Sequence, residues 1–191
     1  MKAAEVLRTA RLNRGLTQRE LATKCQVSQP AIARIESAVE DATLERLNRL
    51  LRPLGSKVTL VPFRTSTVYE TAAFIRDDVS AGEFQHAFRS IIQLNDDIER
   101  ADPATRVALC LTPPNATGDI RFDALIAGLV EYKLESVQLP KPLWVSDLRF
   151  FLENPWDLEQ VPQLQERARL CTPAQFSRHG VFVDAVNFAS V

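Results

Sequence analysis

Apolar positions recur at helical spacing near the start of the chain. Val6, Leu7 and Ala10 share one face of a helix over residues 3–14, and Gly15 follows them. Glycine readily adopts the left-handed conformation that ends many helices. The pattern therefore predicts a first helix that ends close to Gly15.

A second helix is predicted from its N-terminal signal. Thr17 precedes Glu20 by three residues, so the threonine hydroxyl can accept the amide of Glu20 while the carboxylate returns to the amide of Thr17. Leu21, Ala22 and Cys25 then form an inward face. This helix is short, because the Gln26-Val27 turn follows at once.

Ser28 is a good N-cap for a third helix over Gln29–Glu36. Pro30 is compatible with it, because an amide in the first turn has no partner inside the helix. Ile32 and Ile35 are expected to point inward. The positions left on the outer face are Gln29, Ala31 and Arg34.

A fourth helix is predicted over residues 43–51, on the spacing of three leucines and with Gly55 at its close. Lys57–Val61 then alternates polar and apolar residues, as a short strand does. A lone strand needs a partner. One candidate is the same strand of a second subunit, which would make a homodimer.

The second half has mainly helical patterning. Two amphipathic helices are marked by Phe84, Phe88, Ile91, Ile92 and Ile98, and by Phe122, Leu125, Ile126, Leu129, Val130, Leu134 and Val137. Shorter helices are expected over 103–111, 146–152, 160–170 and 173–178. The predicted organisation is a small domain with a short dimerising strand over 1–65, a linker over 66–82 and a larger, mostly helical domain over 83–191.

Composition indicates an ordinary globular protein, with 46% hydrophobic and 25% charged residues. The N-terminus lacks the apolar core of a signal peptide, and no stretch approaches the ~18 apolar residues of a membrane span. We therefore expect a cytoplasmic protein with no membrane partner.

Charge divides the chain into two unlike parts. Residues 1–65 carry 12 Lys/Arg against 6 Asp/Glu, whereas residues 66–191 carry 11 against 18. The basic N-terminal part would attract the phosphate backbone of a nucleic acid, and the acidic C-terminal part would attract a basic partner. Solvated faces of unequal charge would give the same acidic balance.

No catalytic or metal-binding motif stands out. Cys25, Cys110 and Cys171 are far apart and are expected to be buried small side chains, and His86 and His179 are isolated in the sequence. Residues 66–191 hold no phosphate loop and no recognisable nucleophile. We expect no enzyme activity, no cofactor and no metal.

Residues 3–55 resemble the Cro/CI, or Xre-type, helix-turn-helix family. The resemblance rests on Arg11, Gly15-Leu16-Thr17-Gln18, Glu20-Leu21-Ala22, Val27-Ser28-Gln29 and Ile32-Ala33-Arg34-Ile35-Glu36. It implies a mainly α protein whose lambda-repressor-like N-terminal domain places its third helix in the major groove of double-stranded DNA. It also implies that Gln18 braces Gln29 and that Arg11 pairs with Glu36.

On this resemblance the DNA-binding residues lie around the second and third helices. Gln29 carries the donor and acceptor that match adenine, and Arg34 suits either guanine or a phosphate. Gln18 lies where the helix terminus favours a phosphate. The complete candidate set is Thr17, Gln18, Arg19, Ser28, Gln29, Pro30, Ala31 and Arg34.

Two positions depart from the family pattern. Gln26 stands at a turn position that glycine often holds, and a left-handed glutamine costs roughly 1 kcal/mol. Pro30 replaces a polar side chain that could contact a base. A single half-site is then expected to bind weakly, so a homodimer would bind a palindromic operator with half-sites about 34 Å apart.

The C-terminal half looks similar to the same region of some bacterial Xre-type regulators, certain of which accompany toxin genes, some of nucleotidyltransferase type. The similar segments are Pro140–Trp144, Phe150–Leu152, Asn154–Trp156 and Arg178–Asp184. Trp144, Trp156 and Phe182 could form a recognition surface or belong to the core.

Two hypotheses for function remain open. In one, the protein is a repressor and the antitoxin of a type II toxin–antitoxin pair, which neutralises its toxin and autoregulates the operon. In the other, it is a stand-alone regulator whose second half dimerises or senses a small ligand.

Overall fold

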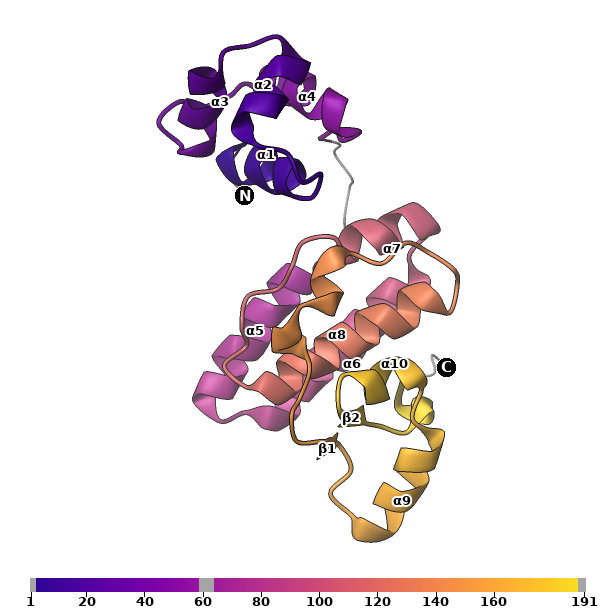
Figure 1. The fold of residues 1–191 in the computed structure, drawn as a ribbon. Coiled ribbons are helices and arrows are strands. Elements are labelled where there is room, and N and C mark those ends of the chain that lie inside the picture. The colour runs from indigo at the N-terminus through magenta and orange to yellow at the C-terminus, as the bar shows by residue number, and fades with distance from the viewer. Residues whose placement is uncertain (1–2, 59–63, 189–191) are drawn as a thin grey trace. The chain divides into compact units, whose positions relative to one another are not determined.

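The computed structural model describes residues 3–58 and 64–188, in two compact units, Met1–Leu60 and Val61–Val191 (Figure 1). Helices make up nearly all of the regular structure that it describes. The predicted fold class, mainly α, is therefore confirmed. None of the described helices is long and apolar enough to cross a membrane.

The N-terminal unit holds the four predicted helices. They are α1 (Ala3–Leu12), α2 (Gln18–Cys25), α3 (Gln29–Glu36) and α4 (Leu44–Leu51), and the 3-10 turn η1 (Arg52–Leu54) follows α4. Gly15 and Gly55 both have the positive φ that was expected at the ends of the first and fourth helices. The strand predicted at Lys57–Val61 lies for the most part outside the described residues.

One apolar core joins the four helices. Leu7 of α1, Leu21 of α2, and Ile32 and Ile35 of α3 are fully or almost fully buried, together with Leu50 of α4. Burial of each such side chain contributes about 1.5–3 kcal/mol before the cost of chain entropy. This core holds α2 and α3 at a fixed angle.

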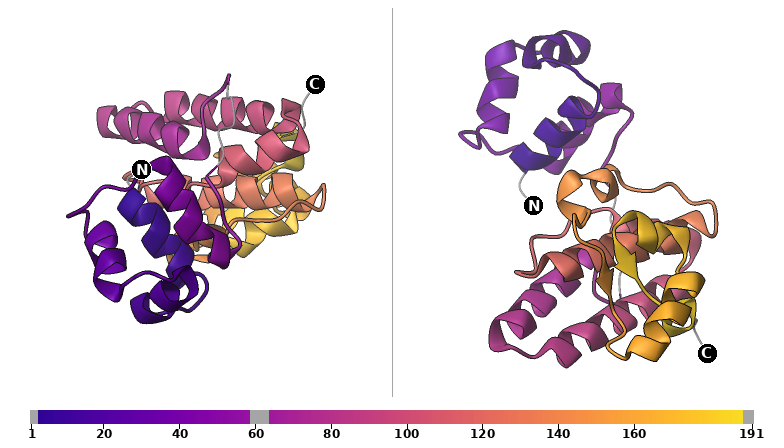
Figure 2. Two further views of the ribbon diagram at one scale, coloured as in Figure 1. Left: turned by 90° about the horizontal axis from the view of Figure 1, so that it is seen from above. Right: turned by 60° about the horizontal axis from the view of Figure 1, so that its bottom comes forward.

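The C-terminal unit is larger (Figures 1 and 2), and prolines lie in the connections that precede α8, α9 and α10. Its helices are α5 (Val68–Ala81), α6 (Phe84–Arg100), α7 (Pro103–Cys110), α8 (Ile120–Glu135), α9 (Pro162–Cys171) and α10 (Ala174–Arg178). Its 3-10 turns are η2 (Leu143–Ser146), η3 (Leu148–Phe150) and η4 (Ala185–Phe188).

Helix α8 is the centre of this unit. It is buried on nearly all sides and lies between the α5–α6 hairpin and the C-terminal segments (Figures 1 and 2). Gly128 lets α10 approach closely, because an added Cβ would lie 2.8 Å from Cδ1 of Phe176 and 3.2 Å from its Cα. Asp123, Glu131 and Lys133 of α8 are buried together with its apolar residues.

Residues 66–82, expected to be a linker, contain α5. Val68, Ala72 and Ile75 of this helix are buried in the core of the C-terminal unit. The signal was present in the sequence: Thr67 and Glu70 form a capping box of the same kind as Thr17 and Glu20.

The helix expected over 146–152 is replaced by η2 and η3. Asp147, between the two turns, has an extended backbone with ψ 135°. Trp144 is buried and its Nε1 donates to the carbonyl of Cys110 at 2.9 Å, and Phe150 is buried as well. Aromatic anchors therefore hold this segment in place of helical hydrogen bonds.

Two short strands were not predicted. β1 (Trp156–Asp157) pairs in parallel with β2 (Val181–Phe182), with Trp156 opposite Val181. Trp156 and Phe182 are half-buried, so of the three aromatic residues left open by the sequence only Trp144 is a core residue.

The cysteines do not share one environment. Cys110 is buried, and burial raises the pKa of its thiol to about 12. Cys25 is half-buried and Cys171 is exposed, so the expectation of a buried side chain was wrong for Cys171. Cys171 is the last residue of α9, a helix in which Ala168 is the buried residue.

Candidate nucleic-acid interface

Helix α2 begins as its sequence predicts. The Glu20 amide donates to Oγ1 of Thr17 at 3.2 Å, and the Thr17 amide donates to Oε2 of Glu20 at 2.7 Å. The predicted capping box is confirmed. It orients the first turn of α2, in which Gln18 and Arg19 lie.

The turn between α2 and α3 has a left-handed glutamine. Gln26 adopts φ 55° and ψ 42°, and its amide donates to the carbonyls of Ala22 and Thr23. The expected departure from glycine is thus accommodated at a cost of about 1 kcal/mol. Ala22 is buried, which fits the close approach of the two helices.

Ser28 is at the N-cap position of α3, but its side chain makes no capping hydrogen bond. The expected capping contact is therefore wrong. Pro30 has no amide to donate, and the Ala31 amide donates to the backbone carbonyl of Ser28 at 3.1 Å. An N-cap side chain binds the amide of the second or third helical residue. Here the second residue, Pro30, has no amide hydrogen, and the amide of the third, Ala31, is already bound.

Four side chains form one hydrogen-bonded chain from the core to the surface. Arg11 donates to Glu36 through Nε at 2.7 Å and Nη2 at 2.8 Å. Nε2 of Gln18 donates to Oε2 of Glu36 at 2.9 Å, and Nε2 of Gln29 donates to Oε1 of Gln18 at 3.0 Å. Both pairings implied by the resemblance are confirmed.

This chain assigns the orientation of both amides. The Glu36 carboxylate only accepts hydrogen bonds, so Gln18 turns its NH₂ group toward it and its carbonyl toward Gln29. Gln29 must then donate one N–H to Gln18. Its second N–H and its Oε1 are the donor and acceptor that a bidentate contact with adenine requires.

The electrostatics of Glu36 follow from its partners. Burial alone raises the pKa of this carboxyl, but hydrogen bonds from Arg11 and Gln18 and the charge of Arg11 lower it by more. The net pKa lies below its ordinary value. Glu36 is therefore an anion at neutral pH, and the amide orientations above depend on that charge.

The remaining candidate residues lie on the surface of α2 and α3. Thr17, Arg19, Ser28, Gln29, Pro30 and Arg34 are exposed, and Gln18 and Ala31 are half-buried. Arg34 also has an acidic neighbour that the sequence analysis did not single out: its Nε lies 3.4 Å from Oε2 of Glu40. The sequence does not single out Glu40, because Glu36, Asp41 and Glu45 also lie between Arg34 and Arg46.

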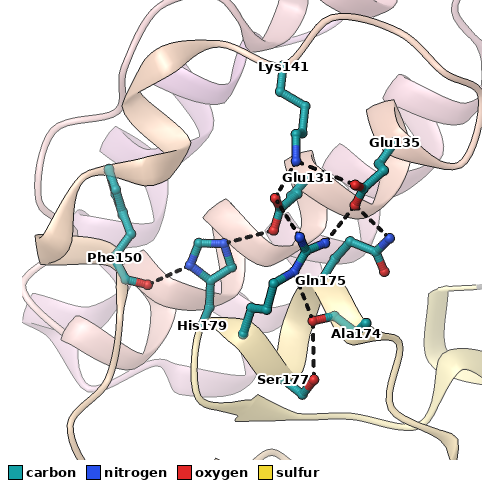
Figure 3. A network of polar contacts seen from close by, with 9 residues as sticks. Glu131, Glu135, Lys141, Phe150, Ala174, Gln175, Ser177 and His179 are labelled. Atoms are coloured by element: carbon teal, nitrogen blue, oxygen red, sulfur yellow. Dashed lines mark hydrogen bonds and ion pairs between the residues drawn. The ribbon is translucent and has the colours of Figure 1, made fainter.

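The C-terminal unit has a cluster of charges of its own (Figure 3). Glu131 and Glu135 of α8 both bind Lys141, at 2.5 and 3.6 Å, and both bind Arg178, at 3.6 and 2.6 Å. Two cations and two anions balance one another. The cluster joins α8 to the last residue of α10 and to the segment before η2.

His179 belongs to the same cluster (Figure 3). Its Nδ1 lies 2.8 Å from the carbonyl of Phe150, which can only accept, so Nδ1 carries the proton. Its Nε2 lies 3.4 Å from Oε2 of Glu131. Burial lowers the pKa of His179 more than Phe150 and Glu131 raise it, so the ring is neutral at pH 7.

Neither histidine has the neighbours of a metal ligand. Among residues 3–58 and 64–188, no three His, Cys, Asp or Glu side chains come together in a group that could hold a metal ion. His86 is exposed beside Asp78, at 3.1 Å.

Comparison with known proteins supports the interpretation of the N-terminal unit. Residues 7–61 match the family model described as Helix-turn-helix. A Haemophilus influenzae protein named an uncharacterized HTH-type transcriptional regulator is 45% identical over 56 residues, which cover 29% of this chain and 57% of that relative. The matched part thus spans little more than half the length of the relative.

No solved structure matches the chain. The N-terminal unit is a helix-turn-helix domain, and the resemblance to Cro/CI-type domains is confirmed for that part of the chain.

Proposed function

We propose that the protein is a transcriptional repressor whose helix-turn-helix domain binds double-stranded DNA in a sequence-specific manner. The observation that carries the proposal is the orientation of Gln29. Its exposed amide retains one donor and one acceptor after it has bound Gln18, and that pair matches the major-groove edge of adenine.

Two further features support the proposal. Residues 1–65 carry twice as many basic as acidic residues, which favours attraction to the phosphate backbone. The relative in Haemophilus influenzae carries the name of a transcriptional regulator. The proposed contact residues are Thr17, Gln18, Arg19, Ser28, Gln29, Pro30, Ala31 and Arg34.

The test begins with selection of bound duplexes from a randomised DNA pool by the full-length protein. Binding to the selected duplex and to a scrambled duplex of the same composition is then compared by fluorescence anisotropy at several salt concentrations. We expect about 10³-fold or tighter binding to the selected duplex and a steep fall of affinity with salt. Equal affinity for both duplexes would refute the proposal.

We further propose that a homodimer binds a palindromic operator. Pro30 offers no polar group at its position in α3, so one half-site has few side chains to specify it. Two inverted copies of a motif, about 34 Å apart between centres, should emerge from the selection. A single uninverted motif, with a monomer in sedimentation, would contradict this.

For the C-terminal unit we propose the role of an antitoxin. Residues 66–191 carry 11 basic against 18 acidic residues, a balance that would attract a basic toxin, such as a nucleotidyltransferase-like protein. The tagged full-length protein should then recover a stoichiometric neighbour-encoded protein from its native cell. Recovery of only the homodimer would favour a stand-alone regulator that senses a small ligand.

A further inference from the structure

The connection between α3 and α4 folds back onto the last turn of α3. Oγ of Ser37 and the amides of Val39 and Glu40 all donate to the carbonyl of Arg34, at 3.2, 3.0 and 3.1 Å. Ala38 between them takes a left-handed backbone with φ 57°. The backbone of Glu40 is thereby held beside the helix that carries Arg34.

From this position the carboxylate of Glu40 reaches two arginines on different helices. Its Oε2 lies 3.4 Å from Nε of Arg34 in α3, and its Oε1 accepts a hydrogen bond from Nη1 of Arg46 in α4. The side chains of Glu40 and Arg46 are each 31% exposed, and that of Arg34 is 63% exposed. One carboxylate thus bridges the two helices at the surface of the domain.

The contact leaves one edge of Arg34 available. The ion pair with Glu40 lies on the Nε side of Arg34, at 3.4 Å, and within the described part of the chain Nη1 and Nη2 of Arg34 donate no hydrogen bond. These two nitrogens form the fork that contacts O6 and N7 of guanine. An exposed arginine otherwise samples many rotamers, and their loss on binding lowers affinity.

We propose that Glu40 is a positioning residue that directs the guanidinium of Arg34 toward a base edge and so increases sequence specificity. This inference rests on the proposed DNA binding. Glu40 is also an anion close to the proposed interface, so it repels phosphates whatever the sequence. The two effects are separable, because repulsion weakens binding to every duplex equally and positioning affects only the duplex whose base Arg34 contacts.

The test uses the full-length protein with the duplex selected by the wild type and its scrambled counterpart. Glu40→Gln has the same shape but can accept hydrogen bonds through only one oxygen, so it cannot hold both arginines. The matched control is Asp41→Asn, which removes an acidic charge from the next residue. Asp41 accepts only the amide of Ala42 within the described chain, and it is not bound to an arginine.

For Glu40→Gln we expect tighter binding to the scrambled duplex and a fall of about tenfold in the ratio of selected to scrambled affinity. For Asp41→Asn both affinities should rise together, with the ratio unchanged. If Glu40→Gln behaves in the same way as Asp41→Asn, Glu40 acts by charge alone and the inference is overturned.

A double-mutant cycle identifies the residue through which Glu40 acts. In an Arg34→Ala background, Glu40→Gln should leave the affinity ratio unchanged. An equal fall in that background would overturn the inference, because Glu40 would then act without Arg34.

If Glu40→Gln proves unfolded by circular dichroism, Glu40→Asp replaces it. This variant keeps the charge but is one methylene too short to bridge α3 and α4, so the ratio should fall while scrambled binding stays unchanged. A wild-type ratio retained by Glu40→Asp would overturn the inference. If the wild type itself fails to prefer any duplex, the proposed function has failed first, and that outcome is seen before any variant is made.

Discussion

Arg11 and Glu36 form a bidentate ion pair that joins α1 to the end of α3, and the two side chains are only 9% and 3% exposed. Oε2 of Glu36 also accepts a hydrogen bond from Gln18, the residue that braces Gln29. Folding of the N-terminal unit and orientation of its outermost amide therefore depend on one buried carboxylate.

On heating, replacement of Arg11 should make the N-terminal unit unfold before the C-terminal unit. Arg11→Ala leaves Glu36 buried without its cation, at an expected cost of about 3–5 kcal/mol. Circular dichroism should report early melting, whereas tryptophan fluorescence should not change, because both tryptophans, Trp144 and Trp156, are in the C-terminal unit. The control is Arg19→Ala, an exposed position of α2, for which the change should be within about 0.5 kcal/mol. Equal losses would contradict the role of the ion pair.

The stability of the N-terminal unit should fall in acid. The pKa of Glu36 in the folded state lies below the ordinary value of 4.5, so its contribution is present above that value and is lost as pH falls through the folded pKa. Urea unfolding of the wild type between pH 7 and pH 3 should show this loss. Glu36→Gln should be less stable at pH 7 and less sensitive to acid, and an unchanged acid dependence would show that other carboxylates are responsible.

Removal of the Gln29 amide should reduce specificity and leave the fold intact. Gln29→Ala should weaken binding to the selected duplex by about 1–3 kcal/mol, with little change on the scrambled duplex. Gln18→Ala should act in the same direction, because it frees the amide of Gln29 to rotate. The effects of the two changes should be less than additive. An unaltered operator preference in Gln29→Ala would refute a base contact.

Ala38 adopts a backbone conformation that favours glycine. With φ 57° its Cβ costs about 1 kcal/mol, so Ala38→Gly should stabilise the N-terminal unit by about 0.5 kcal/mol after the added chain entropy is subtracted. Ala33→Gly within α3 is the matched control and should destabilise by about 1 kcal/mol. The free energy of unfolding of both variants is measured with urea. A change of the same sign in both would contradict the proposed backbone strain at Ala38.

Gly128 should tolerate no side chain. In Gly128→Ala the new Cβ would meet both the ring and the backbone of Phe176, and the backbone cannot move without displacing α10. We expect a loss of about 1–3 kcal/mol in the transition followed by tryptophan fluorescence. In combination with Phe176→Leu the loss should be smaller than the sum of the two single changes. Full additivity would show that this contact is not the cause.

Several elements were predictable because their signals are local. The capping box at Thr17, the left-handed glycines and the apolar spacing of α3 act within one or two turns of helix. Helix α5 was missed although it has such a signal and although its buried residues, Val68, Thr71, Ala72 and Ile75, follow helical spacing. Strands of two residues, such as β1 and β2, have no detectable period.

In the candidate interface too, some features were predictable from the sequence and others were not. The sequence by itself determined the four helices of the N-terminal unit and, through resemblance, which residues surround the turn between α2 and α3. Only the tertiary structure decided which atoms of Gln29 remain available and that Glu40 bridges Arg34 and Arg46. Capping and periodicity depend on neighbours in sequence, whereas the direction of a long polar side chain depends on partners from other helices, which only folding brings within hydrogen-bonding distance.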